Sequence, residues 1–397
     1  MLIVYPDYYK DFSCVAGDCE DTCCAGWEIV IDPKSLKKYH ESGTLKRRLL
    51  RDIQWRKGTF RQCRDGRCAF LRKDGLCDLY RILGADSLCR TCRTYPRHTE
   101  EFENVREITL SISCPQVARM LMERTESVRF LEKETDCEES YENFDYFLFS
   151  CLTDARALML RVLQDRELLI GERLLLVLGI AHDLEVRYRQ GRLGETDEVL
   201  ARAQRPEALK KVRQQLERCR REPEKNYALA KKHFYQLCDL ERLRDAWDQV
   251  LIETQMLLYV QGADSYASLH EEFAQWTNEF LPQLTIQLEQ LAVYFISTYF
   301  SGAVYDGRIY GKADTAVGYV SQLYDLFVAR WLKNEKRLDT EDVIEIVYRY
   351  SREIEHSDPN LEAMERHHWW RIEAADAFDV KTGVRYTKEE SHADQKS

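Results

Sequence analysis

The sequence contains no long hydrophobic run. Its longest apolar stretch, residues 174–180, is far shorter than the roughly 20 residues that a membrane-spanning helix needs. The first residues, 1–7, also lack the basic segment and the small-residue cleavage site of a secretion signal. These absences lead us to expect a soluble, cytoplasmic protein with no membrane partner.

Histidine is scarce, with 9 residues in the chain, and only His40 and His98 fall near the cysteines of the first third. A zinc finger with mixed cysteine and histidine ligands is therefore poorly supported. Cysteine, by contrast, is abundant and clustered. Of the 14 cysteines, ten fall in the first 114 residues: Cys14, Cys19, Cys23, Cys24, Cys63, Cys68, Cys77, Cys89, Cys92 and Cys114.

This clustering predicts a metal or iron–sulfur centre, because several thiolates bind the same metal or cluster. A cysteine in an apolar core packs as a single small hydrophobic residue, so core packing does not explain a cluster of cysteines. A disulfide-stapled secreted domain is the alternative. The expected reducing compartment and the adjacent pair Cys23-Cys24 disfavour it. Between iron–sulfur and zinc, and between one centre and two, the spacing of the cysteines leaves the choice open.

The net charge of −10 is unevenly distributed along the chain. Residues 1–120 contain 21 Lys and Arg against 17 Asp and Glu, a balance of +4, which leaves −14 for the rest. A nucleic-acid-binding protein normally has a broad basic face. We therefore expect no nucleic-acid partner.

The chain divides by pattern into a cysteine-rich module at residues 1–135, an α-helical domain at 136–387 and a disordered tail at 388–397. The module has a short apolar run at residues 28–32 and alternating apolar and polar residues at 108–114, and both patterns are typical of strands. Pro115 is expected to end the second strand, and a helix to begin at Val117. From residue 144 onward apolar residues recur every three or four positions, which predicts about eight helices in a bundle-like array. The fold class is thus mainly α, with a small metal-binding N-terminal module. Cys151 falls on an apolar helical face and is expected in the core.

The cysteine motifs carry a family resemblance. Phe12-x-Cys14-x4-Cys19-x3-Cys23-Cys24-x2-Trp27, followed by Cys68-x-Phe-Leu, Gly75-Leu-Cys77, Cys92-Arg-Thr-Tyr-Pro-Arg97 and Ser113-Cys114-Pro115, resembles the flagellin lysine-N-methylase family and, more distantly, the CxxCxxCC proteins. The resemblance is strong over the N-terminal third. It implies an iron–sulfur enzyme with a [4Fe-4S] cluster that methylates lysine side chains of flagellin, using S-adenosylmethionine as the donor.

The resemblance also implies a ligand set: Cys14, Cys19, Cys23, Cys24, Cys68, Cys77, Cys92 and Cys114. Cys63 and Cys89 match its motifs less clearly. The sequence lacks the motifs of two common classes of enzyme that use S-adenosylmethionine. No Gly-x-Gly-x-Gly turn follows a strand, which argues against a Rossmann methyltransferase, and no Cys-x3-Cys-x2-Cys triplet is present, which argues against the usual radical initiator.

Methyl transfer to lysine needs a neutral amine, although a free lysine has a pKa of about 10.4. Arg97 is a candidate for favouring the neutral amine by its charge, and Tyr95 for relaying the proton. Each has a plainer interpretation, Arg97 as an ion-pair partner and Tyr95 as part of a turn over the centre. The alternative function is a non-enzymatic scaffold in which zinc or an iron–sulfur centre organises a protein-binding module. The sequence predicts no oligomeric state.

Overall fold

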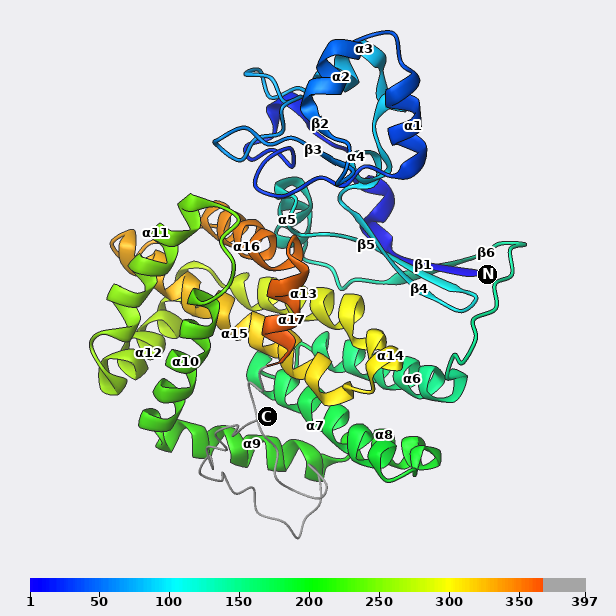
Figure 1. Ribbon diagram of the computed structural model, residues 1–397. Helices are drawn as coiled ribbons and strands as arrows, with labels where there is room; N and C mark the ends of the chain where they lie inside the picture. The colour runs from blue at the N-terminus through cyan, green and yellow to red at the C-terminus, as the bar shows by residue number, and fades with distance from the viewer. Residues whose placement is uncertain (367–397) are drawn as a thin grey trace, which may run out of the picture. The chain divides into compact units, whose positions relative to one another are not determined.

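The computed structural model describes residues 1–366, and its helices and strands are shown in Figure 1. The described residues are mainly helical, with 63% of them in helices and 9% in strands, which confirms the predicted mainly α fold with short strands in the N-terminal region. The metal-binding character of that region stays a prediction. The predicted tail at 388–397 lies outside the described residues. None of the helices in residues 1–366 combines the length and apolar character that crossing a bilayer requires.

The elements follow the chain in this order. The strands are β1 (Leu2–Pro6), β2 (Ile53–Gln54), β3 (Thr59–Phe60), β4 (Arg97–Phe102), β5 (Val105–Leu110) and β6 (Phe130–Glu134). The α-helices are α1 (Pro33–Glu41), α2 (Lys46–Asp52), α3 (Asp78–Leu83), α4 (Arg90–Thr94), α5 (Pro115–Met122), α6 (Tyr146–Leu163), α7 (Ile170–Arg189), α8 (Thr196–Ala203), α9 (Pro206–Arg221), α10 (Pro223–Cys238), α11 (Asp245–Thr254), α12 (Ala263–Phe280), α13 (Leu284–Tyr299), α14 (Ala303–Asp306), α15 (Ile309–Lys333), α16 (Thr340–Glu355) and α17 (Asp358–Glu365).

The chain forms two compact units. The first comprises Met1–Asn143, Asn226–Leu291 and Val320–Met364; within the described residues, the second comprises Phe144–Lys225, Ala292–Tyr319 and residues 365–366. The first unit thus combines the cysteine-rich segment with helices from later in the chain. The boundary expected between residues 135 and 136 stays a prediction.

A four-stranded sheet in the first unit has the order β4-β5-β1-β6 (Figure 1). β1 runs parallel to β5, with Leu2 opposite Val105, and antiparallel to β6. β4 and β5 form an antiparallel hairpin. After β5 the chain turns, and α5 begins with Pro115 at its first position, two residues before the predicted start at Val117, because proline is favourable at the first position of a helix. α5 packs against α16, so the C-terminal helices of this unit reach the cysteine-bearing segment.

A small separate core lies within the cysteine-rich segment. It contains two cysteines, Cys68 and Cys89, among apolar side chains that include Ile29, Tyr39 and Phe70. α1 begins where the Asp32 carboxylate accepts a hydrogen bond from the Ser35 N–H at 3.0 Å. The strand predicted at residues 28–32 is wrong, because only Val30 makes a bridge there, to Thr59.

The second unit is built around α7, against which α6, α8 and α9 pack. Helix α6 confirms the apolar periodicity predicted from residue 144. Cys151 on this helix is 5% exposed, which confirms its predicted place in the core.

Candidate functional site

A pocket of about 500 Å³ lies in the first unit, and cysteines from several segments line it. Seven of the eight predicted ligands contribute to its wall: Cys14, Cys19, Cys23, Cys24, Cys77, Cys92 and Cys114. All fourteen cysteines of the chain are free thiols, so none is committed to a disulfide. Thiols from distant segments of the first third therefore line one pocket, and their role as metal ligands stays a prediction.

Short loops and helix starts bring these thiols together. Cys77 and Cys114 each occupy the residue before a helix, α3 and α5 respectively. The loop that carries Cys14 and Cys19 meets the loop before Cys77 so closely that a β-carbon on Gly75 would lie 3.3 Å from the carbonyl oxygen of Gly17. Gly75 also has a φ of +77°, which glycine adopts without strain.

Two pairs of cysteines share thiol hydrogen bonds. A hydrogen bond with Cys23 is the main cause that lowers the pKa of Cys24, to about 7, and the same contact raises the pKa of Cys23. A hydrogen bond between Cys89 and Cys92 likewise lowers the pKa of Cys89 and raises that of Cys92. In each pair one thiol, that of Cys24 or of Cys89, is therefore easier to deprotonate than its partner. A cysteine must lose its proton to bind a metal.

The remaining cysteines of the segment lie outside the pocket wall. Cys68, a predicted ligand, is 6% exposed, and burial raises its pKa to about 12. Its N–H donates to the carbonyl oxygen of Cys24 at 2.8 Å, which keeps it beside the pocket. Cys63 is exposed, and Cys89 is fully buried next to Cys92. Among residues 1–366, no three histidine, cysteine, aspartate or glutamate side chains are arranged to hold one metal ion.

Two arginines from distant helical segments fix the first cysteine loop. Arg352 of α16, 3% exposed, also lines the pocket. Its Nη1 lies 2.7 Å from Oδ2 of Asp21, and its Nη2 donates to the Asp21 carbonyl oxygen at 2.6 Å. Arg244, just before α11, approaches the other carboxylate oxygen of Asp21 at 3.2 Å and donates to the Ala25 carbonyl oxygen at 2.8 Å.

Arg352 also ties this loop to the chain before α5, since its Nε donates to the carbonyl oxygen of Ser113 at 2.7 Å. Burial raises the pKa of Cys19 and of Cys114, and the hydrogen bond with Cys24 together with burial raises that of Cys23. The charge of Arg352 opposes the rise at each of the three. The guanidinium therefore favours thiolates on this side of the pocket.

Comparison with known proteins assigns the family. Residues 156–375, more than half of the chain, match the family described as FliB lysine N-methylase C-terminal domain. The chain belongs to the FliB lysine N-methylase family. The family predicted from the cysteine motifs is thereby confirmed, through the helical part of the chain rather than through the motifs themselves.

Named relatives of this FliB-family chain come from Salmonella. It is 31% identical over 142 residues to the Lysine-N-methylase of Salmonella typhimurium and to that of Salmonella choleraesuis, which is 34% of this chain and 35% of each relative. It is 30% identical over 144 residues to the Flagellar biosynthetic protein FliU of Salmonella muenchen, covering 85% of that protein. The chain thus spans about a third of the length of the two lysine-N-methylases. No solved structure matches it.

The two predicted catalytic residues of the FliB-family chain both line the cysteine pocket. The Tyr95 phenol lies 3.0 Å from Oγ of Ser113, and burial raises its pKa well above the usual value, so the phenol holds its proton. Arg97 donates from Nε to the Tyr9 hydroxyl at 3.1 Å, and its guanidinium lies over the rings of Tyr9 and Phe12.

Sequence reasoning missed the side chains that α16 and the Arg244 segment supply to this FliB-family site. His356 is one of them, with its ring centroid 4.7 Å from that of Trp27 and 5.6 Å from that of Tyr95. Burial lowers its pKa to about 3, which leaves the imidazole neutral at neutral pH. Neither His356 nor the arginines belong to a spaced motif, so no local signal marked them.

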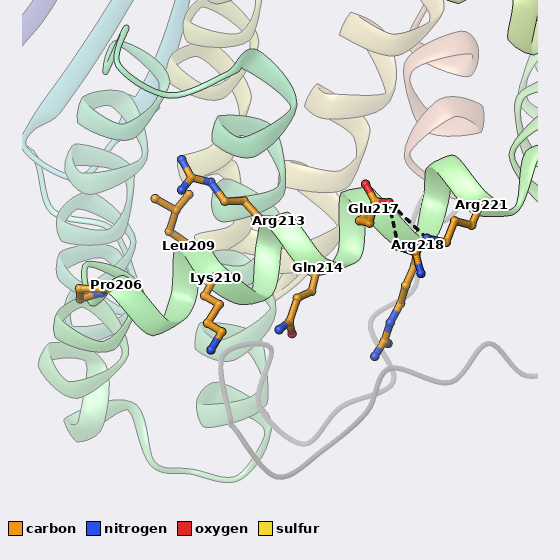
Figure 2. A pocket seen from close by; sticks show the side chains of 8 residues that line it. All are labelled: Pro206, Leu209, Lys210, Arg213, Gln214, Glu217, Arg218 and Arg221. Carbon is orange, nitrogen blue, oxygen red and sulfur yellow. Dashed lines mark hydrogen bonds and ion pairs between the residues drawn. The ribbon is translucent and has the colours of Figure 1, made fainter.

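A second cavity, of about 760 Å³, lies along α9 in the second unit. Figure 2 shows that its eight labelled lining residues all come from this helix. Two of its arginines are paired with carboxylates, Arg213 with Glu172 at 2.7 Å and Arg221 with Glu217 at 3.0 Å. It is lined by no cysteine and contains none of the predicted site residues.

Proposed function

We propose that this protein is an iron–sulfur enzyme that transfers a methyl group from S-adenosylmethionine to lysine side chains of flagellin. The observation that carries the proposal is the pocket in which seven free thiols meet Tyr95 and Arg97. Membership of a lysine N-methylase family supports the reaction class. A similar chain is named a flagellar biosynthetic protein, which supports a flagellar substrate.

The donor set fits an iron–sulfur cluster. Such clusters are held by thiolates, and a cluster of several atoms takes its ligands from further apart than a single ion does. Free thiols on separate loops around one pocket meet that need. A [4Fe-4S] cluster takes four cysteine thiolates, one on each iron. Its four ligands would come from the seven cysteines of the pocket wall, Cys14, Cys19, Cys23, Cys24, Cys77, Cys92 and Cys114, with Cys68 beside them. When bound, the cluster would supply a redox-active centre with Lewis-acidic iron.

The protein's own charges favour the neutral form of an entering lysine amine. Arg97 and Arg352 both line the pocket, and two nearby guanidinium groups oppose a third positive charge. The pocket is also walled by aromatic side chains, those of Phe12, Trp27 and Tyr95, which exclude water from the amine. A neutral amine has the free electron pair that attack on the sulfonium methyl group requires.

The proposal is tested by producing the chain together with flagellin under anaerobic conditions and measuring lysine methylation by mass spectrometry. Wild type is expected to methylate flagellin lysines. Cys23→Ser is expected to abolish methylation, whereas Cys137→Ser, which changes an exposed thiol outside the pocket, leaves it intact. If wild type binds flagellin without methylating it, the scaffold function replaces the enzyme. If Cys23→Ser methylates like wild type, the cysteine pocket has no part in the reaction.

A further inference from the structure

A continuous chain of hydrogen bonds leads from the pocket to a carboxylate on α16. The Tyr95 hydroxyl, in the pocket wall, lies 3.0 Å from Oγ of Ser113. Oγ of Ser113 lies 2.6 Å from Oγ of Ser111, which donates to Oε2 of Glu355 at 2.5 Å. Three consecutive contacts of hydrogen-bond length therefore join a pocket residue to an ionisable group.

The Glu355 carboxylate can only accept, and this fixes which group donates in each hydrogen bond of the series. Ser111 donates its one hydroxyl hydrogen to Glu355, so its oxygen accepts a hydrogen bond from Ser113. Ser113 therefore donates to Ser111 and accepts a hydrogen bond from the Tyr95 hydroxyl. All three hydroxyl groups consequently point from the pocket toward Glu355, the arrangement that a proton transfer in that direction requires.

The two serines are held rigidly. The side chain of Ser111 is 8% exposed and that of Ser113 is fully buried, and both residues lie in the turn between β5 and α5. The Ser111 N–H donates to the Pro96 carbonyl oxygen at 2.8 Å, and the Ser113 carbonyl oxygen accepts from Arg352. Fixed backbone on both sides keeps the hydroxyl groups in line.

His356 forms a side branch rather than the end of the chain. Its Nε2 lies 2.9 Å from Oγ of Ser113, and since that oxygen already donates to Ser111, Nε2 carries a hydrogen and donates. The neutral imidazole therefore supports Ser113 without taking its proton. Other charges act on Glu355: Arg352 lies one turn earlier on α16, and His98 of β4 faces it, itself paired with Glu100 at 2.6 Å.

We propose that Tyr95, Ser113, Ser111 and Glu355 form the route by which the substrate lysine loses its proton before methyl transfer. The proposal rests on the proposed function. The lysine ammonium gives a proton to Oη of Tyr95, each hydroxyl passes its own proton onward, and the Glu355 carboxylate gains one. The freed amine electron pair then forms the N–CH₃ bond while the S–CH₃ bond of S-adenosylmethionine breaks and its electron pair stays on sulfur. Tyr95 is the catalytic residue of this route, and the other three are positioning residues that act through it.

The decisive variant is Glu355→Gln, which still accepts the Ser111 hydroxyl but cannot take up a proton at neutral pH. Glu353→Gln is the matched control, because Glu353 lies on the same helix, outside the pocket wall, and accepts from the Leu243 N–H at 2.9 Å. Both variants and wild type are assayed for kcat on purified flagellin with S-adenosylmethionine from about pH 7 to about pH 10. Thermal unfolding of each is measured alongside.

We expect Glu355→Gln to lower kcat about 100-fold near neutral pH, the lower range of a general acid–base contribution. The loss should shrink as pH approaches the lysine pKa of about 10.4, because the amine then loses its proton to solvent. Ser111→Ala should behave likewise, and Ser111→Thr, which keeps a hydroxyl group, should restore activity. Glu353→Gln should resemble wild type.

A kcat of Glu355→Gln that equals wild type, or that is reduced equally at every pH, would overturn the relay while leaving the proposed methyl transfer intact. A wild-type enzyme that methylates no lysine would contradict the proposed function and the relay with it.

Discussion

Gly26 lies beneath the side chain of Arg244, so closely that a β-carbon on Gly26 would come within 2.1 Å of Arg244 Nε. The glycine has a φ of +89°. From this position Arg244 donates to the Ala25 and Thr22 carbonyl oxygens and pairs with Asp21. The loop that carries Cys19, Cys23 and Cys24 therefore depends on a residue more than 200 positions away in the chain.

Gly26→Ala should displace Arg244 and release this loop. The arginine side chain is flexible and can swing aside, so the loss is that of its hydrogen bonds, roughly 1 to 3 kcal/mol, added to the backbone strain. Gly84→Ala is the control, because Gly84 has a similar φ of +80° and no atom within 4 Å of the added β-carbon. It should show the strain alone, about 1 to 3 kcal/mol, because its ψ of 174° lies in a backbone region that essentially only glycine adopts. Equal unfolding free energies for the two variants in urea titrations would contradict the contact.

Arg352→Gln should weaken metal binding. Its charge favours thiolates and its hydrogen bonds hold two cysteine-bearing segments, so its loss should reduce affinity about 10- to 100-fold, as for other residues that orient metal ligands. Arg173→Gln is the control: Arg173 is 2% exposed, donates to the Leu163 and Leu168 carbonyl oxygens, and does not line the pocket. Iron is counted after anaerobic reconstitution. Equal iron in both variants would show that Arg352 serves stability alone.

Stability should fall as pH rises because of Glu353. Burial raises the pKa of this carboxyl to about 7 from 4.5, so the folded state binds more protons than the unfolded state between those values. Unfolding free energy should therefore decrease from about pH 4.5 to about pH 7 and then level off. Glu353→Gln should be more stable than wild type by about 2 to 3 kcal/mol near pH 8, with the difference vanishing near pH 4.5. A difference independent of pH in urea titrations would contradict this.

His270 should make a second pH-dependent contribution to stability, one that is favourable at low pH. Its Nδ1 lies 2.8 Å from the Tyr266 carbonyl oxygen and its Nε2 lies 2.8 Å from Oδ1 of Asp325, so both ring nitrogens face acceptors. Burial lowers the pKa of His270, but the hydrogen bond and charge of Asp325 outweigh it and raise the pKa above 6.5.

The stabilisation from this pair is fully present below about pH 6.5 and is lost as pH rises through the folded-state pKa. His270→Gln should therefore destabilise the protein near pH 6 and much less near pH 9, measured by urea unfolding. A destabilisation that grows with pH would contradict the ion pair.

Local patterns in the sequence predicted the helices well. The apolar stripe from residue 144 corresponds to α6. Asp339 caps α16, since its carboxylate accepts from the Asp342 N–H at 2.9 Å. Periodicity succeeds here because one face of each helix is buried within its unit.

The strand patterns were less informative because polar partners came from distant residues. The alternation at residues 108–114 indicated a strand with one polar face, yet β5 ends at Leu110, and Thr109, Ser111 and Ser113 are buried. At residues 28–32 the backbone makes two hydrogen bonds with the short β3 segment, from the Ile31 N–H to the Gly58 carbonyl oxygen at 2.7 Å and from the Phe60 N–H to the Ile29 carbonyl oxygen at 3.1 Å. The Val30 carbonyl oxygen accepts instead from the Thr91 hydroxyl at 2.8 Å.

Of the residues in the cysteine site, the sequence marked the cysteines but not the arginine that orients them. Their spacing and family resemblance marked eight cysteines, of which seven line the pocket. Arg352 could not be inferred, because its role depends on α16 packing against α5, a contact between residues more than 200 positions apart.

The most direct test of the central claim, that these thiols hold an iron–sulfur cluster, is the content of iron, acid-labile sulfide and zinc in anaerobically purified protein. The account predicts brown wild-type protein with iron and sulfide in equal amounts, loss of both in Cys92→Ser, and retention in Cys137→Ser. Wild-type protein that contains zinc without sulfide, or a Cys92→Ser variant with undiminished iron and sulfide, would contradict it.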